Sequence, residues 1–291
     1  MSNDPMSGRH GVVLFSTMTT TTAYSVCLQI ARSHYENFPV ASWLVPAHLR
    51  GPIAAIYAFA RRADDVADEG QVDTSERLES LRALRERLHS PIMTDAVDVA
   101  LSDTMNRHAL PTHLLERLID AFVSDVQHQP FTTWHELLAY CSNSADPVGE
   151  ALLRLDHSPD EPSDEAVECS NCVCSALQIT NFLQDMAIDR GRGRSYLPDD
   201  IPTVVERTYE LFNVGRGILN HLRSRRLRWE VALTIAGGVT ILDLCADREA
   251  DSFRPALGLR HVLHVMRRLN HVIKGKPLVP GIRAPRDDSN S

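Results

Sequence analysis

The sequence lacks several features that would assign it to a specialised class of protein. Acidic residues outnumber basic ones and the formal net charge is -8, so no nucleic-acid partner is expected. No uninterrupted run approaches the roughly 20 apolar residues of a membrane-spanning helix, and the first residues do not resemble a secretory leader. Alternating strand patterns are nearly absent. We therefore expect a helical cytoplasmic protein, soluble or in peripheral contact with the inner face of the membrane.

The six cysteines form no disulfide pattern. The chain is too long to need covalent cross-links for stability, so reduced thiols are expected. Cys169, Cys172 and Cys174 have a spacing found in metal sites, but a structural zinc site needs four ligands and the sequence offers no second pair. We expect these three thiols to pack within a helix.

Helical periodicity dominates the chain. Apolar residues recur at i, i+3, i+4 and i+7, and prolines separate the periodic segments. The clearest segments are 53–60, 78–88, 113–126, 166–190 and 204–223. The pattern predicts one all-α domain of roughly six to ten helices. We expect a loosely ordered leader over 1–30, the domain over 31–273, and a disordered tail rich in proline and charge over 274–291.

The first chemically informative segment contains two aspartates one helical turn apart. Asp64 and Asp68 project from the same face of a helix, about 40° apart around its axis. Like charges at this spacing destabilise an isolated helix, so a solvated acidic turn is the alternative to a functional pair. Arg61, one turn earlier, and the apolar residues before it favour a functional role.

A second helix repeats this arrangement. Asp185 and Asp189 are again four residues apart, and Asn181 and Gln178 continue the same face through otherwise apolar surroundings. Polar groups lined up in apolar company need partners, and oxygen ligands of this kind suit magnesium. A cationic, glycine-containing loop follows, with Arg190, Arg194 and Tyr196.

Together the two acidic helices indicate a clamp for a diphosphate. Roughly two or three magnesium ions would bridge the carboxylates to the leaving group. The cation left behind would need a dry, apolar cavity where water cannot react with it early. The motif pair therefore predicts a magnesium-dependent enzyme that ionises an allylic-type prenyl diphosphate.

At these motifs the sequence resembles the squalene and phytoene synthases, the head-to-head branch of the trans-isoprenyl diphosphate synthases, over roughly residues 31–270. Within that group it is most similar to the hydroxysqualene synthases of the bacterial hopanoid pathway. The resemblance is carried by the segments His34–Ser42, Tyr57–Glu69, Tyr140–Gly149, Leu177–Asn181 and Gly193–Pro198. It implies an isoprenoid-synthase helical bundle around a central apolar cavity.

The resemblance also implies roles for individual residues. The implied magnesium ligands are Asp64, Asp68, Asn181, Asp185 and Asp189. The implied contacts to the prenyl diphosphate are Asn37, Tyr57, Arg61, Gln178, Arg190, Arg194 and Tyr196. Tyr140 matches a tyrosine that lines the reaction cavity, although a buried tyrosine with a bonded hydroxyl is the alternative.

Three departures from the family pattern resemble the hydroxysqualene branch. Asn37-Phe38 replaces Ser-Phe, Gln184 and Ile188 replace the arginine and glutamate of the second acidic motif, and Ser144-Ala145-Asp146 replaces Val-Ala-Gly. The implied reaction is ionisation of presqualene diphosphate, rearrangement and capture of the cation by water, with no NADPH. The enzyme would then act beside a presqualene diphosphate synthase and an oxidoreductase that reduces hydroxysqualene.

Three alternatives stay open. Condensation of two farnesyl diphosphates to presqualene diphosphate, squalene or a dehydro product would use the same scaffold. A non-catalytic partner that binds prenyl lipid for a paralogous synthase would be expected to carry broken aspartate motifs, which are intact here. A di-iron helical protein would need Glu-x-x-His pairs, which we do not find.

Three features near the C-terminus have simple structural explanations. His261, His264 and His271, with Arg260, Arg267 and Arg268, predict a solvated polar helix face. The arginines of 223–228 predict exposed helix charge, with contact to anionic lipid as the alternative. Gly237-Gly238 indicates either close helix packing or room for a prenyl chain.

Overall fold

The computed structural model describes residues 18–33, 44–68, 73–127, 131–191, 197–246 and 254–279. Within these ranges there are eleven α-helices, two short 3₁₀ helices and no strand, which confirms the all-α prediction. The helices are α1 Thr20–Ser33, α2 Ala47–Asp68, α3 Thr74–His89, α4 Ala96–His108, α5 Thr112–Gln127, α6 Trp134–Ser144, α7 Asp146–His157, α8 Asp164–Gly191, α9 Ile201–Gly215, η1 Arg216–Asn220, α10 Arg225–Ala246, η2 Leu259–His261 and α11 Val262–Ile273.

The estimate of six to ten helices was too low because several helices are separated by very short breaks. Only Ala145 separates α6 from α7, and Pro147 lies in the first turn of the new helix, where its missing N–H costs nothing. Side-chain caps begin other helices: Asp73 accepts from the backbone N–H of Glu76, and Thr133 and Glu136 form a capping box at α6.

Two segment boundaries differ from the sequence prediction. Residues 20–30, expected in a loosely ordered leader, belong to α1, which buries Ala23, Cys27 and Ala31. The segment predicted as one helix over 204–223 is instead α9, which ends at Gly215 and continues as η1. The helices predicted at 113–126 and 166–190 are confirmed as α5 and α8.

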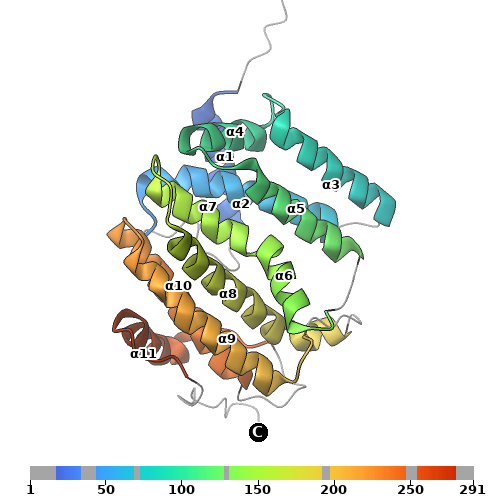
Figure 1. The fold of residues 1–291 in the computed structure, drawn as a ribbon. Coiled ribbons are helices and arrows are strands. Elements are labelled where there is room, and N and C mark those ends of the chain that lie inside the picture. The colour runs from blue at the N-terminus through green and yellow to red at the C-terminus, as the bar shows by residue number, and fades with distance from the viewer. Residues whose placement is uncertain are drawn as a thin grey trace, which may run out of the picture.

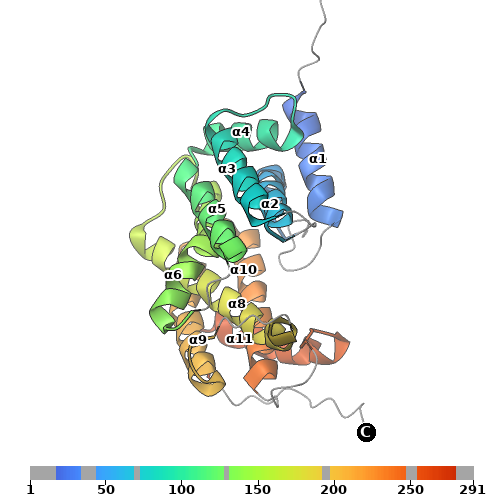
Figure 2. The ribbon, with the colours of Figure 1, turned by 90° about the vertical axis from the view of Figure 1, so that its right-hand side faces the viewer.

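The helices form a bundle with two groups. Figure 1 shows α1 to α5 in the upper part, α8 to α11 in the lower part, and α7 between them beside α2 and α5. The long α8 contacts α6, α7, α9 and α10, and α7 contacts both α2 and α8. In Figure 2, α2 and α8 both end on the side turned to the viewer. The two helices with the aspartate pairs thus present their carboxyl-terminal ends on one side of the molecule.

Close helix packing explains one of the two adjacent glycines in α10. A Cβ atom at Gly238 would lie 2.5 Å from Leu177 Cδ2 and 3.0 Å from the ring of Phe212. At Gly237 the nearest atom would be Leu257 Cδ1 at 3.7 Å, an ordinary contact. Gly238 therefore lets α10 approach α8 and α9.

The prediction of a solvated polar face on α11 is wrong for three of its residues. His261 and His264 are buried, and Arg268 is 0% exposed. His264 Nε2 lies 2.7 Å from Asp243 Oδ2 of α10, and Arg268 Nε donates to the same oxygen at 2.8 Å. The helix is held to α10 through these polar groups, while large apolar side chains of α11 face solvent.

The last described residues are tied to α9, although the sequence predicted a disordered tail from 274 onward. The side chain of Asn213 donates to the carbonyl of Leu278 at 2.7 Å and accepts from its N–H at 2.9 Å. Residues 280–291 lie outside the described part of the chain.

The cysteines form neither disulfides nor a metal site in the described part of the chain. All six cysteines are free thiols, and no group of three or more metal-binding side chains occurs within the described ranges.

By length and composition α10 could cross a membrane, but 56% of its most apolar window is buried inside the fold. A buried core helix has the same properties.

Candidate active site

The first acidic motif lies on the last two turns of α2. Arg61 pairs with two carboxylates: its Nη1 lies 2.8 Å from Asp64 Oδ2, and its Nε lies 2.8 Å from Asp65 Oδ1. Asp68, one turn further, is exposed. Tyr57, one turn before Arg61, is half-buried and packs against the core. The same stripe thus carries an aromatic ring, a cation and carboxylates, as the sequence predicts.

The second acidic motif lies on the last turns of α8. Arg254, from the segment after α10, approaches Asp185: its Nε lies 2.5 Å from Oδ1, and its Nη2 donates to Oδ2 at 3.3 Å. The side-chain amide of Gln184 donates to the carbonyl of Pro255. Residues 254–255 are therefore held against the end of α8 that carries the motif.

The oxygen donors that the structure describes fit a hard divalent cation. Asp64 and Asp68 are carboxylates one turn apart on α2, and Asn181 precedes Asp185 by one turn on α8. Oδ1 of Asp185 is buried, and Arg254 is the cation that the structure places against it. A metal ion would take the place of the arginine at this oxygen, and Arg254 could then bind a phosphate oxygen.

A cluster of aromatic rings lies beside the second motif. The ring centroids of Phe131 and Tyr140 are 5.0 Å apart, and Tyr140 lies 5.8 Å from Phe182, the neighbour of Asn181 on α8. The Tyr140 hydroxyl donates to Asp125 Oδ2 at 3.0 Å. Tyr140 is half-buried and its hydroxyl is bonded, as the structural alternative expects, and its role in a reaction cavity stays a prediction.

Several predicted site residues lie outside what the structure describes. Asn37, Arg194 and Tyr196 fall in undescribed segments, and the side chains of Asp189 and Arg190 are likewise not described. Gln178 is placed on α8, partly exposed, one turn before Asn181.

Four residues that the structure brings to the site were missed by the sequence reasoning. Arg254 is 69 residues from Asp185 in sequence, and no motif links them. Asp125, Phe131 and Phe182 belong to ordinary amphipathic patterns, and only the tertiary contact with Tyr140 makes them notable.

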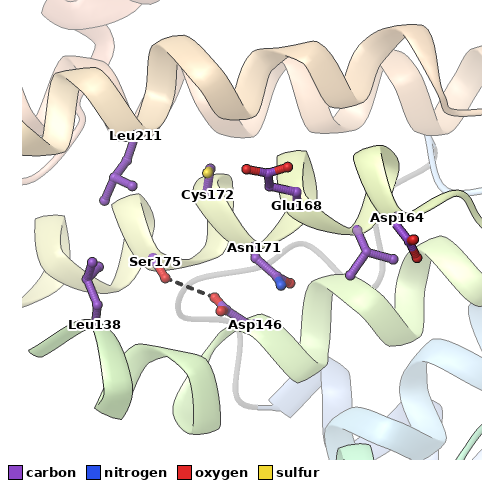
Figure 3. Close-up of a pocket in the computed structure, with 9 residues that line it drawn as sticks. Leu138, Asp146, Asp164, Glu168, Asn171, Cys172, Ser175 and Leu211 are labelled. Carbon is purple, nitrogen blue, oxygen red and sulfur yellow. Dashed lines mark hydrogen bonds between the residues drawn. The ribbon is translucent and has the colours of Figure 1, made fainter. Parts of the chain in front are cut away.

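A separate cleft of about 510 Å³ lies along the other half of α8. Figure 3 shows its lining, with Asp146 at the start of α7 facing Ser175. The Ser175 hydroxyl donates to Asp146 Oδ1 at 2.9 Å, and burial raises the pKa of the Asp146 carboxyl to about 7. Ser175 is ten residues before Asp185, about 15 Å along the helix axis at 1.5 Å per residue. The cleft is therefore distinct from the acidic motifs.

The helical architecture and the two acidic helices define an enzyme of the isoprenoid-synthase fold. Its solved neighbours include a squalene synthase, HpnC, from Alicyclobacillus acidocaldarius, with 33% identity, a TM-score of 0.70, and coverage of 78% of this chain and 94% of that one. A profile described as squalene/phytoene synthase matches residues 31–203. The chain belongs to the squalene/phytoene synthase family.

Curated relatives within the family carry two different names. A hydroxysqualene synthase from Rhodopseudomonas palustris is 32% identical over 75% of this chain and 82% of its own length. Another from Zymomonas mobilis is 36% identical over 60% of this chain, which matches only 58% of that relative. A phytoene synthase from Mycobacterium tuberculosis is 31% identical over 84% of this chain and 75% of its own length. These similarities establish the family, and they include more than one reaction within it.

Proposed function

We propose that this enzyme converts presqualene diphosphate and water to hydroxysqualene and diphosphate. The observation that carries the proposal is the similarity to curated hydroxysqualene synthases, which extends over three quarters of the chain for the Rhodopseudomonas relative. The departures from the Ser-Phe, Arg-Asp-x-x-Glu-Asp and Val-Ala-Gly patterns support the same branch.

In this proposal the ends of α2 and α8 bind the diphosphate. Arg61 and Arg254 already contact the acidic motifs and would neutralise phosphate oxygens when the substrate enters. Bound magnesium, held by Asp64, Asp68, Asn181, Asp185 and Asp189, would supply the Lewis-acid charge that stabilises the leaving diphosphate. The breaking C–O bond leaves its electron pair on the diphosphate.

The aromatic cluster is suited to the other half of the reaction. Phe131, Tyr140 and Phe182 present rings next to the metal-binding end of α8, and aromatic faces stabilise cations without reacting with them. The bond between Tyr140 and Asp125 fixes the tyrosine ring in place. Water must enter only after rearrangement, since early capture would yield a different alcohol.

Conservative substitutions at the acidic motifs test the site. Asp64→Asn and Asp185→Asn keep side-chain size but remove the charge, and each should lower turnover of presqualene diphosphate at least about a hundredfold. The matched control is Asp120→Asn on α5, an exposed aspartate paired only at the surface with Arg85. It should retain activity, and circular dichroism should show the same helicity in all three variants. Near-normal turnover of either motif variant would contradict the proposed site.

The rival reaction is condensation of two prenyl diphosphates, and the phytoene synthase relatives favour it. Incubation with farnesyl or geranylgeranyl diphosphate in place of presqualene diphosphate separates the two. Under our proposal the condensing substrates are not consumed. We further propose that the enzyme works in the cytoplasm between a synthase that supplies presqualene diphosphate and an oxidoreductase that consumes hydroxysqualene.

A further inference from the structure

The surface formed by η2 and α11 has an inverted polarity. Leu259 is 93% exposed and Leu263 is 84% exposed, and Val262 and Met266 are also more than half exposed. These four residues, called here the α11 surface, follow the i, i+3, i+4, i+7 spacing of a single helical stripe. Figure 1 shows α11 at the edge of the bundle, packed beside α10.

The opposite stripe of α11 is polar and buried, whereas polar residues on a surface helix normally face solvent. His264 and Arg268 point inward and bind Asp243. Because the buried ion network fixes this orientation, the apolar stripe cannot turn into the core. A contiguous apolar surface on an otherwise polar molecule marks a place where a partner or membrane binds.

The charges around the α11 surface indicate which partner it would bind. From Arg254 to Val279 the chain contains no aspartate or glutamate, although the whole protein has a net charge of -8. Arg260, Arg267, Lys274 and Lys276 are all exposed in this stretch. Apolar side chains surrounded by cations complement an anionic lipid bilayer. A second copy of the chain, docked through the same surface, would bring like charges together.

Two observations extend the α11 surface along neighbouring elements. Trp229 and Leu233 lie one turn apart on α10 and are exposed, and at Gly237, the next position on that stripe, a Cβ atom would lie 3.7 Å from Leu257. Tryptophan side chains are common at membrane interfaces. At its other end the surface begins five residues after Arg254, which contacts Asp185. A short segment of chain therefore connects it to the candidate active site.

We infer that the α11 surface docks the enzyme on an anionic membrane, with Leu259 and Leu263 inserted among the lipids and Arg267 and Lys274 against the headgroups. The docking goes beyond the proposed reaction and does not depend on it. It would place the site beside the phase in which water-insoluble prenyl products dissolve.

Vesicle flotation of the purified full chain without substrate tests this inference, so the result is separate from the identity of the reaction. Two preparations are compared: phosphatidylcholine alone and phosphatidylcholine with 30% phosphatidylglycerol, a proportion of about one anionic lipid in three chosen to give a negative surface. The wild type should bind the anionic vesicles and be released by roughly 0.5 M salt, because screening removes the charge attraction.

Paired variants separate the apolar and the charged contributions. Leu259→Asp with Leu263→Asp should weaken binding at least about tenfold. Arg267→Glu with Lys274→Glu should weaken it at least about thirtyfold, since each lost cation near the surface corresponds to about fivefold and each new carboxylate is repelled by the lipid. The matched controls are Met93→Asp, an exposed apolar residue before α4, and Arg82→Glu, an exposed cation on α3; both should bind as the wild type does.

Three outcomes would overturn the inference. Binding that the α11 variants leave unchanged would place the contact elsewhere. Failure of the wild type to bind anionic vesicles would exclude lipid docking. A dimer in light scattering that Leu263→Asp dissociates, without vesicle binding, would assign the surface to a second copy of the chain.

Discussion

The buried ion network between α10 and α11 gives the sharpest stability prediction. Asp243 accepts hydrogen bonds from Tyr209, His264 and Arg268, so three buried polar side chains share one carboxylate. Arg268 is fully buried and also lies 5.8 Å from the centre of the Tyr209 ring. Asp243→Asn removes the charge with little change in volume and leaves the guanidinium uncompensated.

The expected cost follows from that uncompensated charge. Breaking a buried ion pair by removing one partner costs about 3–5 kcal/mol, which for a chain of this size corresponds to a fall in Tm of about 10 °C. Calorimetry or thermal circular dichroism measures it. Asp243→Leu combined with Arg268→Met removes both charges and should cost less than Asp243→Asn alone, because no ion is left buried.

A surface ion pair provides the control. Asp199 lies 3.0 Å from Arg207, and both side chains are more than a third exposed. Asp199→Asn should change the free energy of unfolding by less than about 1 kcal/mol. A cost of Asp243→Asn no larger than that of Asp199→Asn would rule out a strongly coupled buried ion pair, and so would a double variant that costs as much as the sum of its two single variants.

Two further predictions concern packing and pH. Gly238→Ala should destabilise the fold by about 1–3 kcal/mol, because its Cβ would lie 2.5 Å from Leu177, whereas Gly237→Ala should be neutral or stabilising by up to about 1 kcal/mol; thermal melts that rank the two equally would contradict the packing argument. The pKa of Asp146 is raised to about 7, so the folded state retains a proton that the unfolded chain releases near pH 4, and the free energy of unfolding should fall as pH rises from 4 to 7. At about 1.4 kcal/mol per pKa unit the fall is at most about 4 kcal/mol. Asp146→Asn should match the wild type at pH 4 and exceed its stability at pH 8, and urea titrations that show the same pH dependence in both proteins would exclude this role.

Local sequence patterns were sufficient to predict the helical fold and the two acidic stripes. The positions of Asp64, Asp68 and Asp185 follow from four-residue spacing, a property of the single helix, so they needed no tertiary information. The same holds for α5, where periodic leucines define the buried face.

The features that were not predicted from the sequence depend on contacts between residues far apart in the chain. The histidines of α11 were predicted to face water because they are polar, yet Asp243 on another helix provides a buried partner for His264. The pairing of Arg254 with Asp185 joins residues far apart in sequence. Residues 20–30 contain threonines and serine that suggested a loose leader, but three small residues spaced along α1 are buried against the rest of the bundle.

Product analysis with purified enzyme tests whether the protein makes hydroxysqualene. Presqualene diphosphate is incubated with magnesium, with and without NADPH, and products are identified by mass spectrometry. We expect hydroxysqualene in both reactions, its new oxygen labelled in ¹⁸O-water, and no product when magnesium is chelated. Absence of hydroxysqualene, together with consumption of farnesyl diphosphate, would contradict the proposed reaction and assign the enzyme to the condensing branch of the family.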